Sequence, residues 1–138
     1  MRTRRTELLP PSGLCKKVFD YAMHGKGAGG FGSAWLISRG DKIYVRGHNS
    51  KKLELATWRF NKRGTGHAKM LLSYLETLVL SGKIPQTELF VESVTNQRFA
   101  EHFRRRDCWV EVGSGPHFLF SEQQIAADIL SLAMDERV

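Results

Sequence analysis

The chain has 138 residues, which is long enough for one domain with a hydrophobic core and too short for two ordinary domains. Its apolar fraction of 41% and charged fraction of 25% are typical of a globular protein and argue against disorder over most of its length. The net charge of +7 predicts attraction to anions such as nucleic acid, an acidic protein or a polyphosphate cofactor. No apolar run approaches the roughly 20 residues of a membrane span, and the N-terminus lacks a signal-peptide core, so we expect a cytoplasmic protein.

The two cysteines, Cys15 and Cys108, have neither the spacing of metal ligands nor the density of a disulfide scaffold. We therefore expect two free thiols, with Cys108 the more buried. The histidines also lack the spacing of metal ligands, so the sequence predicts no metal site.

The sequence of the N-terminal part predicts three segments: an arm or edge strand, a helix and a loop. Residues 1–10 form either a loose arm or an edge strand, because two prolines at positions 10 and 11 stop what precedes them. Ser12 can cap an amphipathic helix that ends at His24. Residues 25–32, GKGAGGFG, contain a formal G-x-G-x-x-G, but they follow a helix instead of a strand, so we interpret them as a loop.

Three segments rich in β-branched and aromatic residues come next, at Phe31–Ser38, Ile43–Arg46 and Leu53–Phe60. Turn residues separate them, which predicts three successive antiparallel strands. A glycine turn at residues 63–68 then opens an amphipathic helix that ends at Gly82.

The segment Thr87–Val94 alternates between apolar and polar residues, as a strand does. We expect it to run parallel to Leu53–Phe60, because a strand–helix–strand crossover joins parallel neighbours. The remaining predicted elements are a short helix from Thr95 or Asn96, a hairpin of Trp109–Val112 and His117–Phe120, and a final helix after the capping box at Ser121.

Two motifs carry a family resemblance. Arg63-Gly64-Thr65-Gly66-His67-Ala68 lies between a predicted strand and a long helix, and Asn96–Phe103 follows the next strand about thirty residues later. On these motifs the chain resembles the GNAT superfamily of acyl-CoA N-acyltransferases, over roughly Phe31–Phe120. The resemblance implies an α+β fold of the three-layer type, with a mixed and mostly antiparallel sheet, a central parallel pair splayed around the cofactor, and helices on both faces. The whole chain, 1–138, would be one such domain.

The glycine turn suits phosphate, because glycines allow close backbone approach and a helix N-terminus supplies N–H donors. The resemblance implies that the ligand is acetyl-CoA, the acyl donor. The turn would hold its pyrophosphate, and the strand before the turn would pair with its pantetheine arm. The residues expected to contact the cofactor are Trp58, Arg59, Phe60, Arg63, Gly64, Thr65, Gly66, His67, Ala68, Asn96 and Phe103.

Direct acetyl transfer to a primary amine requires a neutral amine, a polarised carbonyl and a route for the proton. Glu54 is the first candidate base, with a solvated glutamate paired to a nearby lysine as the alternative, and Glu92 is the second candidate. Many relatives carry a tyrosine that protonates the leaving thiolate where this chain has Phe103, which has no hydroxyl. The alternatives for that proton are Tyr74, Ser93, His102, Cys108 and water.

The acceptor stays open between a protein lysine or N-terminus, a small amine and a nucleic-acid-associated amine. The basic composition makes nucleic acid or an acidic protein a possible partner, and a homodimer is a further possibility; no membrane partner is expected. Phe103 and the short region before Phe31 motivate a rival hypothesis. In it the chain is a catalytically weak GNAT-like module that binds nucleic acid or a protein partner.

Overall fold

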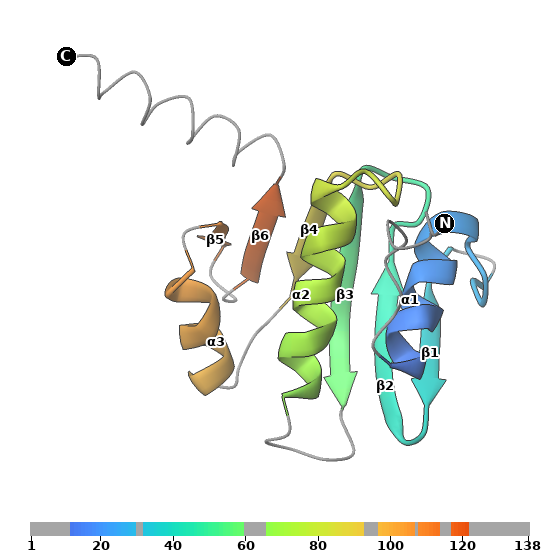
Figure 1. Cartoon of the computed structure of the whole chain (residues 1–138), viewed down its shortest axis with the longest axis horizontal. Helices are drawn as coiled ribbons and strands as arrows, with labels where there is room; N and C mark the ends of the chain where they lie inside the picture. The colour runs from blue at the N-terminus through green and yellow to red at the C-terminus, as the bar shows by residue number, and fades with distance from the viewer. Residues whose placement is uncertain are drawn as a thin grey trace, which may run out of the picture.

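The computed structural model describes residues 12–29, 32–59, 66–92, 97–106, 108–113 and 117–121. These residues form three helices and six strands around a single sheet, with strand order β1-β2-β3-β4-β6-β5 (Figure 1). The helices are α1 (Gly13–His24), α2 (His67–Leu80) and α3 (Gln97–Arg104). The strands are β1 (Ala34–Ser38), β2 (Asp41–Arg46), β3 (Lys52–Arg59), β4 (Glu88–Val91), β5 (Trp109–Val112) and β6 (His117–Ser121).

The sheet is mixed and mostly antiparallel, as the sequence predicted. Its parallel pair is β3 and β4, which α2 connects. The other neighbouring strands pair antiparallel, and β6 lies between β4 and β5. The fold is therefore α+β with one parallel strand pair inside an antiparallel sheet.

Local signals at the ends of α1 explain where this helix begins and ends. The Ser12 hydroxyl accepts a hydrogen bond from the backbone N–H of Cys15 at 3.2 Å, which is an N-cap contact. Gly25 follows the helix with φ of 69°, a left-handed conformation that glycine adopts without strain, and its N–H donates to the Tyr21 carbonyl. The predicted cap and end of this helix are confirmed.

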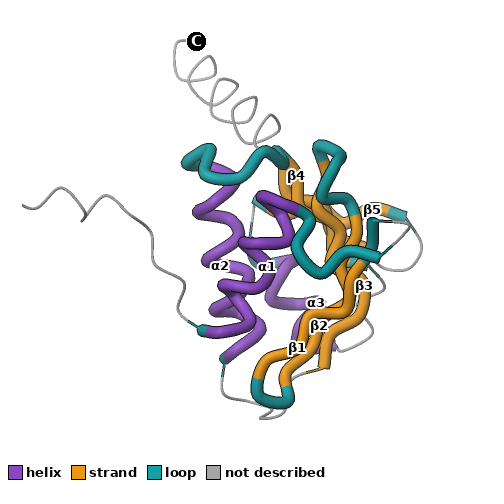
Figure 2. Tube along the Cα trace, turned by 90° about the vertical axis from the view of Figure 1, so that its right-hand side faces the viewer, coloured by secondary structure: helices purple, strands orange, loops and turns teal. Residues whose placement is uncertain are grey.

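One face of the sheet is inward and carries the helices. Strand register places Leu55, Val91 and Phe118 on this face, and all three are fully buried. Figure 2 shows α1 and α2 against one side of the sheet. The ring of Phe103 from α3 stacks on Phe118 with 4.7 Å between ring centroids, so α3 packs on the same side.

We expected helices on both faces of the sheet. Among the described residues, the three helices α1, α2 and α3 all cover the inward face. The final helix predicted after Ser121 lies outside the described residues. No helix in the described part of the chain is long and apolar enough to cross a membrane.

A buried carboxylate ties α2 to the segment after α3. Glu76 is 6% exposed and accepts two hydrogen bonds from the Arg106 guanidinium, at 2.7 and 2.6 Å. It accepts a third, at 2.6 Å, from the Trp109 indole N–H. Three charge-assisted contacts thus fix α2 against β5 and the end of α3.

The relative burial of the two cysteines was predicted wrongly. Cys15 is 1% exposed, because it lies on the face of α1 that packs against the core, whereas Cys108 is only half-buried. Burial raises the pKa of both thiols. Both cysteines are free thiols, as expected.

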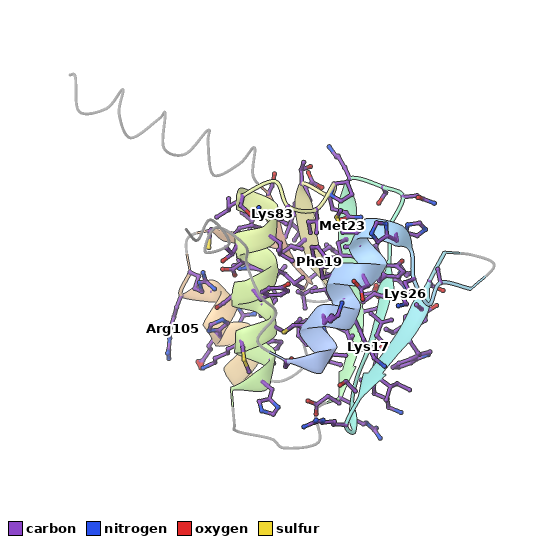
Figure 3. The ribbon with its side chains drawn as sticks, turned by 45° about the vertical axis from the view of Figure 1, so that its right-hand side comes forward. Lys17, Phe19, Met23, Lys26, Lys83 and Arg105 are labelled. Atoms are coloured by element: carbon purple, nitrogen blue, oxygen red, sulfur yellow. The ribbon has the colours of Figure 1, made fainter. Side chains whose placement is uncertain are left out.

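The outer edge of the sheet is capped by a lysine. Lys17 on α1, labelled in Figure 3, donates from Nζ to the backbone carbonyl of Ile37 in the edge strand β1 at 2.6 Å. The other labelled cations in this view, Lys26, Lys83 and Arg105, come from separate segments of the chain and lie apart from one another.

Candidate functional site

The two parallel strands separate part-way along β3. Pairing runs from Lys52 with Glu88 to Leu55 with Val91, and the Glu92 N–H then donates to the Leu55 carbonyl at 3.2 Å. β4 ends there, but β3 continues to Arg59, as Figure 1 shows. Among the described residues, the last part of β3 pairs with β2 alone.

A β-bulge lies where this separation begins. Val45 pairs with Leu55 and Tyr44 pairs with Thr57, so Ala56 is an extra residue in β3. A bulge bends its strand and redirects the side chains that follow. The last residues of β3 are therefore turned away from the direction of β4 at the point where its pairing stops.

Two predicted cofactor residues contribute to the aromatic packing beside this opening. The Trp58 ring lies edge-on to Phe99 of α3, 5.5 Å between centroids, and its indole N–H donates to the Leu55 carbonyl at 3.4 Å. Phe103 is 0% exposed and packs among Phe99, Trp109 and Phe118. Its ring belongs to the core and offers a ligand no surface in this structure, because the apolar stripe of α3 points into the sheet.

At the far end of β3, helix α2 begins without a side-chain cap. Gly66 precedes the helix with φ of 81°, and its carbonyl accepts the first helical bond, from the Met70 N–H at 2.9 Å. The N–H groups of His67, Ala68 and Lys69 therefore precede the helical ladder and have no acceptor within it. A Cβ built on Gly66 would meet none of the described residues within 4 Å, so among these residues the space beside Gly66 is open.

His67 links the start of α2 to the β1–β2 hairpin. Its Nδ1 lies 3.4 Å from a carboxylate oxygen of Asp41, the first residue of β2. The start of α2 and the tip of this hairpin therefore lie at the same end of the sheet. This contact to the protein was not expected from the sequence, which placed His67 beside the cofactor.

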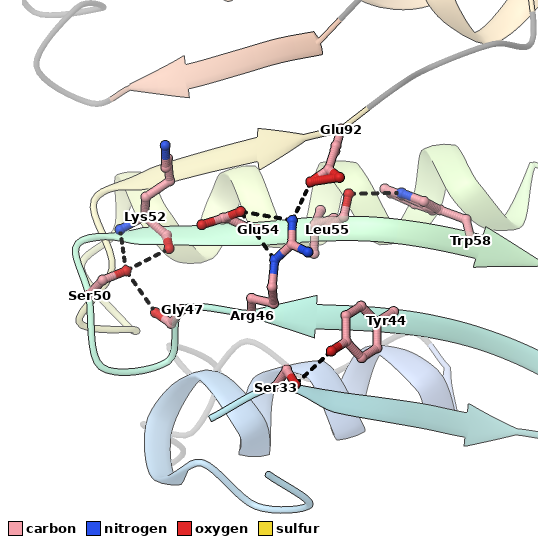
Figure 4. A network of polar contacts seen from close by, with 10 residues as sticks. All are labelled: Ser33, Tyr44, Arg46, Gly47, Ser50, Lys52, Glu54, Leu55, Trp58 and Glu92. Atoms are coloured by element: carbon pink, nitrogen blue, oxygen red, sulfur yellow. Dashed lines mark hydrogen bonds and ion pairs between the residues drawn. The ribbon is translucent and has the colours of Figure 1, made fainter. Parts of the chain in front are cut away.

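The two candidate bases are brought together by an arginine (Figure 4). Arg46 on β2 donates from Nε and Nη2 to one oxygen of Glu54, at 3.3 and 3.1 Å, and from Nη2 to Glu92. Burial opposes the charged guanidinium, but its hydrogen bonds to Glu92 and Glu54 outweigh this, so the pKa of Arg46 is raised. All three lie on the outward face, where the pairing of β3 with β4 ends.

Two of the other candidate proton donors, Tyr74 and His102, lie apart from this trio. Tyr74 is 6% exposed on α2, facing Cys15 and Asp20 of α1, and burial raises its pKa. His102 lies in α3, close to α2, and its Nε2 is buried with no hydrogen-bond partner among the described residues. The structure therefore places Glu54 and Glu92 together on the outward face of the sheet. Tyr74 and His102 lie in the helical layer instead.

Several predicted site residues lie outside the described residues. These are Phe60, Arg63, Gly64, Thr65, Ser93 and Asn96. Of the predicted pyrophosphate turn, the structure describes Gly66, His67 and Ala68.

Arg46 was missed by the sequence reasoning, although a signal was present. In β2 the residues Ile43 and Val45 are buried, so strand alternation places Tyr44 and Arg46 on the opposite face. Pairing β2 with the next strand in an antiparallel register then brings Arg46 opposite Glu54.

A separate surface hollow lies at the opposite end of β3. It has a volume of about 610 Å³ and is lined by Met23, His24, His48, Asn49, Ser50, Lys51 and Pro85. None of these residues belongs to the candidate site. No group of three or more potential metal ligands occurs within the described part of the chain.

No protein-family model and no curated protein matches the chain. Among solved structures, one described as "The crystal structure of KacTA-DNA complex" aligns over 91% of this chain and 90% of its own, with a TM-score of 0.49 and 13% identity. A similarity this low does not indicate a function.

Proposed function

We propose that the protein is an N-acetyltransferase that moves an acetyl group from acetyl-CoA directly to a primary amine. The observation that carries the proposal is the uncapped start of α2, the next described element after β3, where backbone N–H donors lie beside a Gly66 whose added Cβ would meet none of the described residues. A helix N-terminus with unpaired N–H groups favours phosphate through hydrogen bonds and the helix dipole. The first turn carries no acidic side chain that would compete for these donors.

The parting of β3 and β4 supports a second part of the donor site. Beyond Leu55 the edge of β3 that faces away from β2 has no partner strand among the described residues. Such an edge pairs readily with the amide groups of an extended ligand. The pantetheine arm of acetyl-CoA has two amides, and it would run along Thr57–Arg59 from the start of α2 toward the outward face.

The carboxylates at the other end of this path supply the base. In the transfer, the amine nitrogen attacks the thioester carbonyl, the carbon–sulfur bond breaks, and the sulfur leaves as a thiolate. Glu54 or Glu92 accepts the proton that the amine loses, directly or through water. Arg46 holds both carboxylates in place, and water supplies the proton to the thiolate, since Tyr74 is buried in the helical layer and Phe103 has no hydroxyl.

The test is the binding of acetyl-CoA to Ala68→Glu. The positive N-terminal end of the helix dipole stabilises a carboxylate in the first turn of α2, so the substitution leaves the fold intact. The same carboxylate repels a pyrophosphate that approaches the backbone N–H groups. Acetyl-CoA at 100 times its dissociation constant should stabilise the wild-type chain by about 2.7 kcal/mol. That stabilisation should disappear in Ala68→Glu.

The matched control is Thr77→Glu, the same added charge on an exposed position of the same helix. It lies about 13 Å along the axis from Ala68, so acetyl-CoA should stabilise it as it does the wild type. Gly66→Glu is a weaker test, because φ of 81° strains any side chain there. Equal affinity of Ala68→Glu and wild type for acetyl-CoA would falsify the proposal, and the rival hypothesis of a non-catalytic module would then be the better account.

A further inference from the structure

A surface on the outward face of the sheet adjoins the path proposed for the pantetheine arm along the backbone of Thr57–Arg59, but its side chains have no role in the proposed acetyl transfer. Strand register places six side chains together there, from β1, β2 and the end of β3. They are Trp35, Ile37, Lys42, Tyr44, Thr57 and Arg59, and we call them the hairpin surface. None of the six is acidic.

The aromatic side chains of the hairpin surface are open to solvent. Trp35 is 49% exposed and Ile37 is 53% exposed, and the two lie on the same face of β1, so they form a solvent-facing apolar patch. The rings of Trp35 and Tyr44 lie 5.1 Å apart, and the Tyr44 hydroxyl donates to the Ser33 hydroxyl at 2.7 Å. These contacts hold the two rings as a fixed platform in front of solvent.

The cations beside these rings are available to a ligand. The ammonium of Lys42 lies 5.5 Å from the centre of the Trp35 ring, and Arg59 is exposed next to Lys42 in the register. No ion pair joins either cation to another described residue, whereas the nearby Arg46 is occupied by two glutamates. The hairpin surface therefore combines stacking faces with uncompensated positive charge.

The turn that closes the hairpin adds a third cation at a conformational cost. Arg39 is exposed at the tip and has φ of 52°, the one described non-glycine residue with a positive φ. Asparagine or glycine fits this backbone conformation better than a long side chain does. A residue held in a strained backbone conformation is a reason to look for a function of its side chain.

We infer that the hairpin surface binds single-stranded nucleic acid. Unpaired bases stack on exposed aromatic rings, and the phosphates between them pair with lysine and arginine. Trp35 and Tyr44 provide the rings, and Arg39, Lys42 and Arg59 provide the charges. The net charge of +7 adds a long-range attraction for a polyanion.

Other occupants fit the surface less well. A second copy of the chain would bring Arg39, Lys42 and Arg59 against their own equivalents, and these like charges repel. An acidic peptide would satisfy the cations, but its carboxylate side chains offer no aromatic face to stack on Trp35 and Tyr44. A duplex has its bases already stacked on one another, so it would use the charges alone.

The inference that the hairpin surface binds single-stranded nucleic acid does not depend on acetyl transfer. If the proposed acetyltransferase function also holds, the acceptor is an amine carried by a nucleic acid. Asp41 begins the strand that carries Lys42 and contacts His67 at the start of α2, so the hairpin surface ends beside the proposed donor site. A strand bound across this surface would then present an amine that it carries near Glu54 and Glu92.

The test measures fluorescence anisotropy of a labelled twelve-nucleotide oligo(U) with the full chain between 50 and 300 mM KCl. In Lys42→Gln/Arg59→Gln the affinity should fall about tenfold, and the slope of log affinity against log salt should shrink by about 1.4, or about 0.7 for each phosphate that the protein no longer neutralises. The control, Lys26→Gln/Lys83→Gln, removes the same charge from exposed positions elsewhere (Figure 3) and should change the affinity less than twofold. Trp35→Ala should lower it about fivefold or more, because a base can no longer stack on the indole ring.

Three results would overturn the inference. The first is no binding of oligo(U) at 50 mM KCl, and the second is an equal loss of oligo(U) affinity in the two double variants. The third is an unchanged oligo(U) affinity in Trp35→Ala together with polyglutamate that binds the wild-type chain as tightly as oligo(U) does. The first excludes nucleic acid, the second indicates diffuse charge, and the third indicates an acidic protein partner. Stabilisation by acetyl-CoA, measured on the same samples, separates this test from the proposed function. If acetyl-CoA stabilises a chain that does not bind oligo(U), only this inference fails; the reverse pattern removes only the acetyltransferase proposal.

Discussion

The buried carboxylate of Glu76 gives the sharpest prediction for stability. Glu76→Gln keeps the size of the side chain and removes its charge. The carboxylate now accepts three hydrogen bonds, from Nη1 and Nη2 of Arg106 and from Nε1 of Trp109. A glutamine has one carbonyl oxygen to accept with, and its amide would point N–H groups at one of these donors.

The magnitude follows from what the substitution leaves behind. Breaking a fully buried ion pair costs about 3–5 kcal/mol, because the remaining charge has no partner. The Arg106 side chain is 32% exposed, so water can reach part of the guanidinium and reduce that cost. We expect a loss of about 2 kcal/mol in the free energy of unfolding, which corresponds to a drop in Tm of roughly 6–8 °C for a chain of this size.

Urea unfolding followed by tryptophan fluorescence measures this loss. Arg106→Gln and the double variant complete a double-mutant cycle, in which the two changes should couple by about 1–2 kcal/mol. A loss below about 0.5 kcal/mol in Glu76→Gln would show that the three contacts do not hold α2 against β5, and the reasoning would be refuted.

Three further predictions concern single side chains. Arg39→Asn should raise the free energy of unfolding in urea melts by about 1 kcal/mol, because asparagine tolerates φ of 52° better than arginine does. It should also weaken oligo(U) binding. A destabilised variant would show that the backbone of Arg39 is not strained. Arg46→Gln should slow acetyl transfer at least tenfold in a coupled thiol assay, with acetyl-CoA affinity unchanged, because Glu54 and Glu92 lose the cation that orders them; an unchanged rate contradicts this. Burial, aided by the positive charge of nearby Lys69 and Arg106, lowers the pKa of His102 below 6.5, so protonation favours the unfolded chain. Stability should therefore fall as the pH drops through 6.5, and urea melts between pH 5 and 7 should show a weaker fall in His102→Leu; an identical fall assigns the effect to other groups.

The order and type of the described elements could be predicted because they depend on local signals. Periodicity identified each strand and helix, Ser12 marked the start of α1, and the crossover through α2 predicted that β3 and β4 are parallel. Alternation along Thr87–Val94 also predicted the strand that the structure has as β4. These signals act over a few residues, so the sequence displays them directly.

The contacts of the candidate site could be predicted less well, because they join distant parts of the chain. Glu92 meets Arg46 across 46 positions, and Glu76 meets Arg106 across 30. Phe103 was expected beside a cofactor, but the packing of α3 on β5 and β6 decides that its ring is buried. A glutamate inside an apolar helical stripe is a clue to a buried partner, yet the sequence does not say which cation that is.

The contact between Lys17 and the Ile37 carbonyl bears on how the chain avoids self-association through its sheet. An edge strand with an exposed tryptophan and an exposed isoleucine is a template onto which another chain could add a strand. The ammonium occupies one carbonyl on that edge, so an incoming strand would have to displace a charge to complete its hydrogen bonds. Trp35 and Ile37 can therefore stay open to a ligand without making the edge of β1 a site of aggregation.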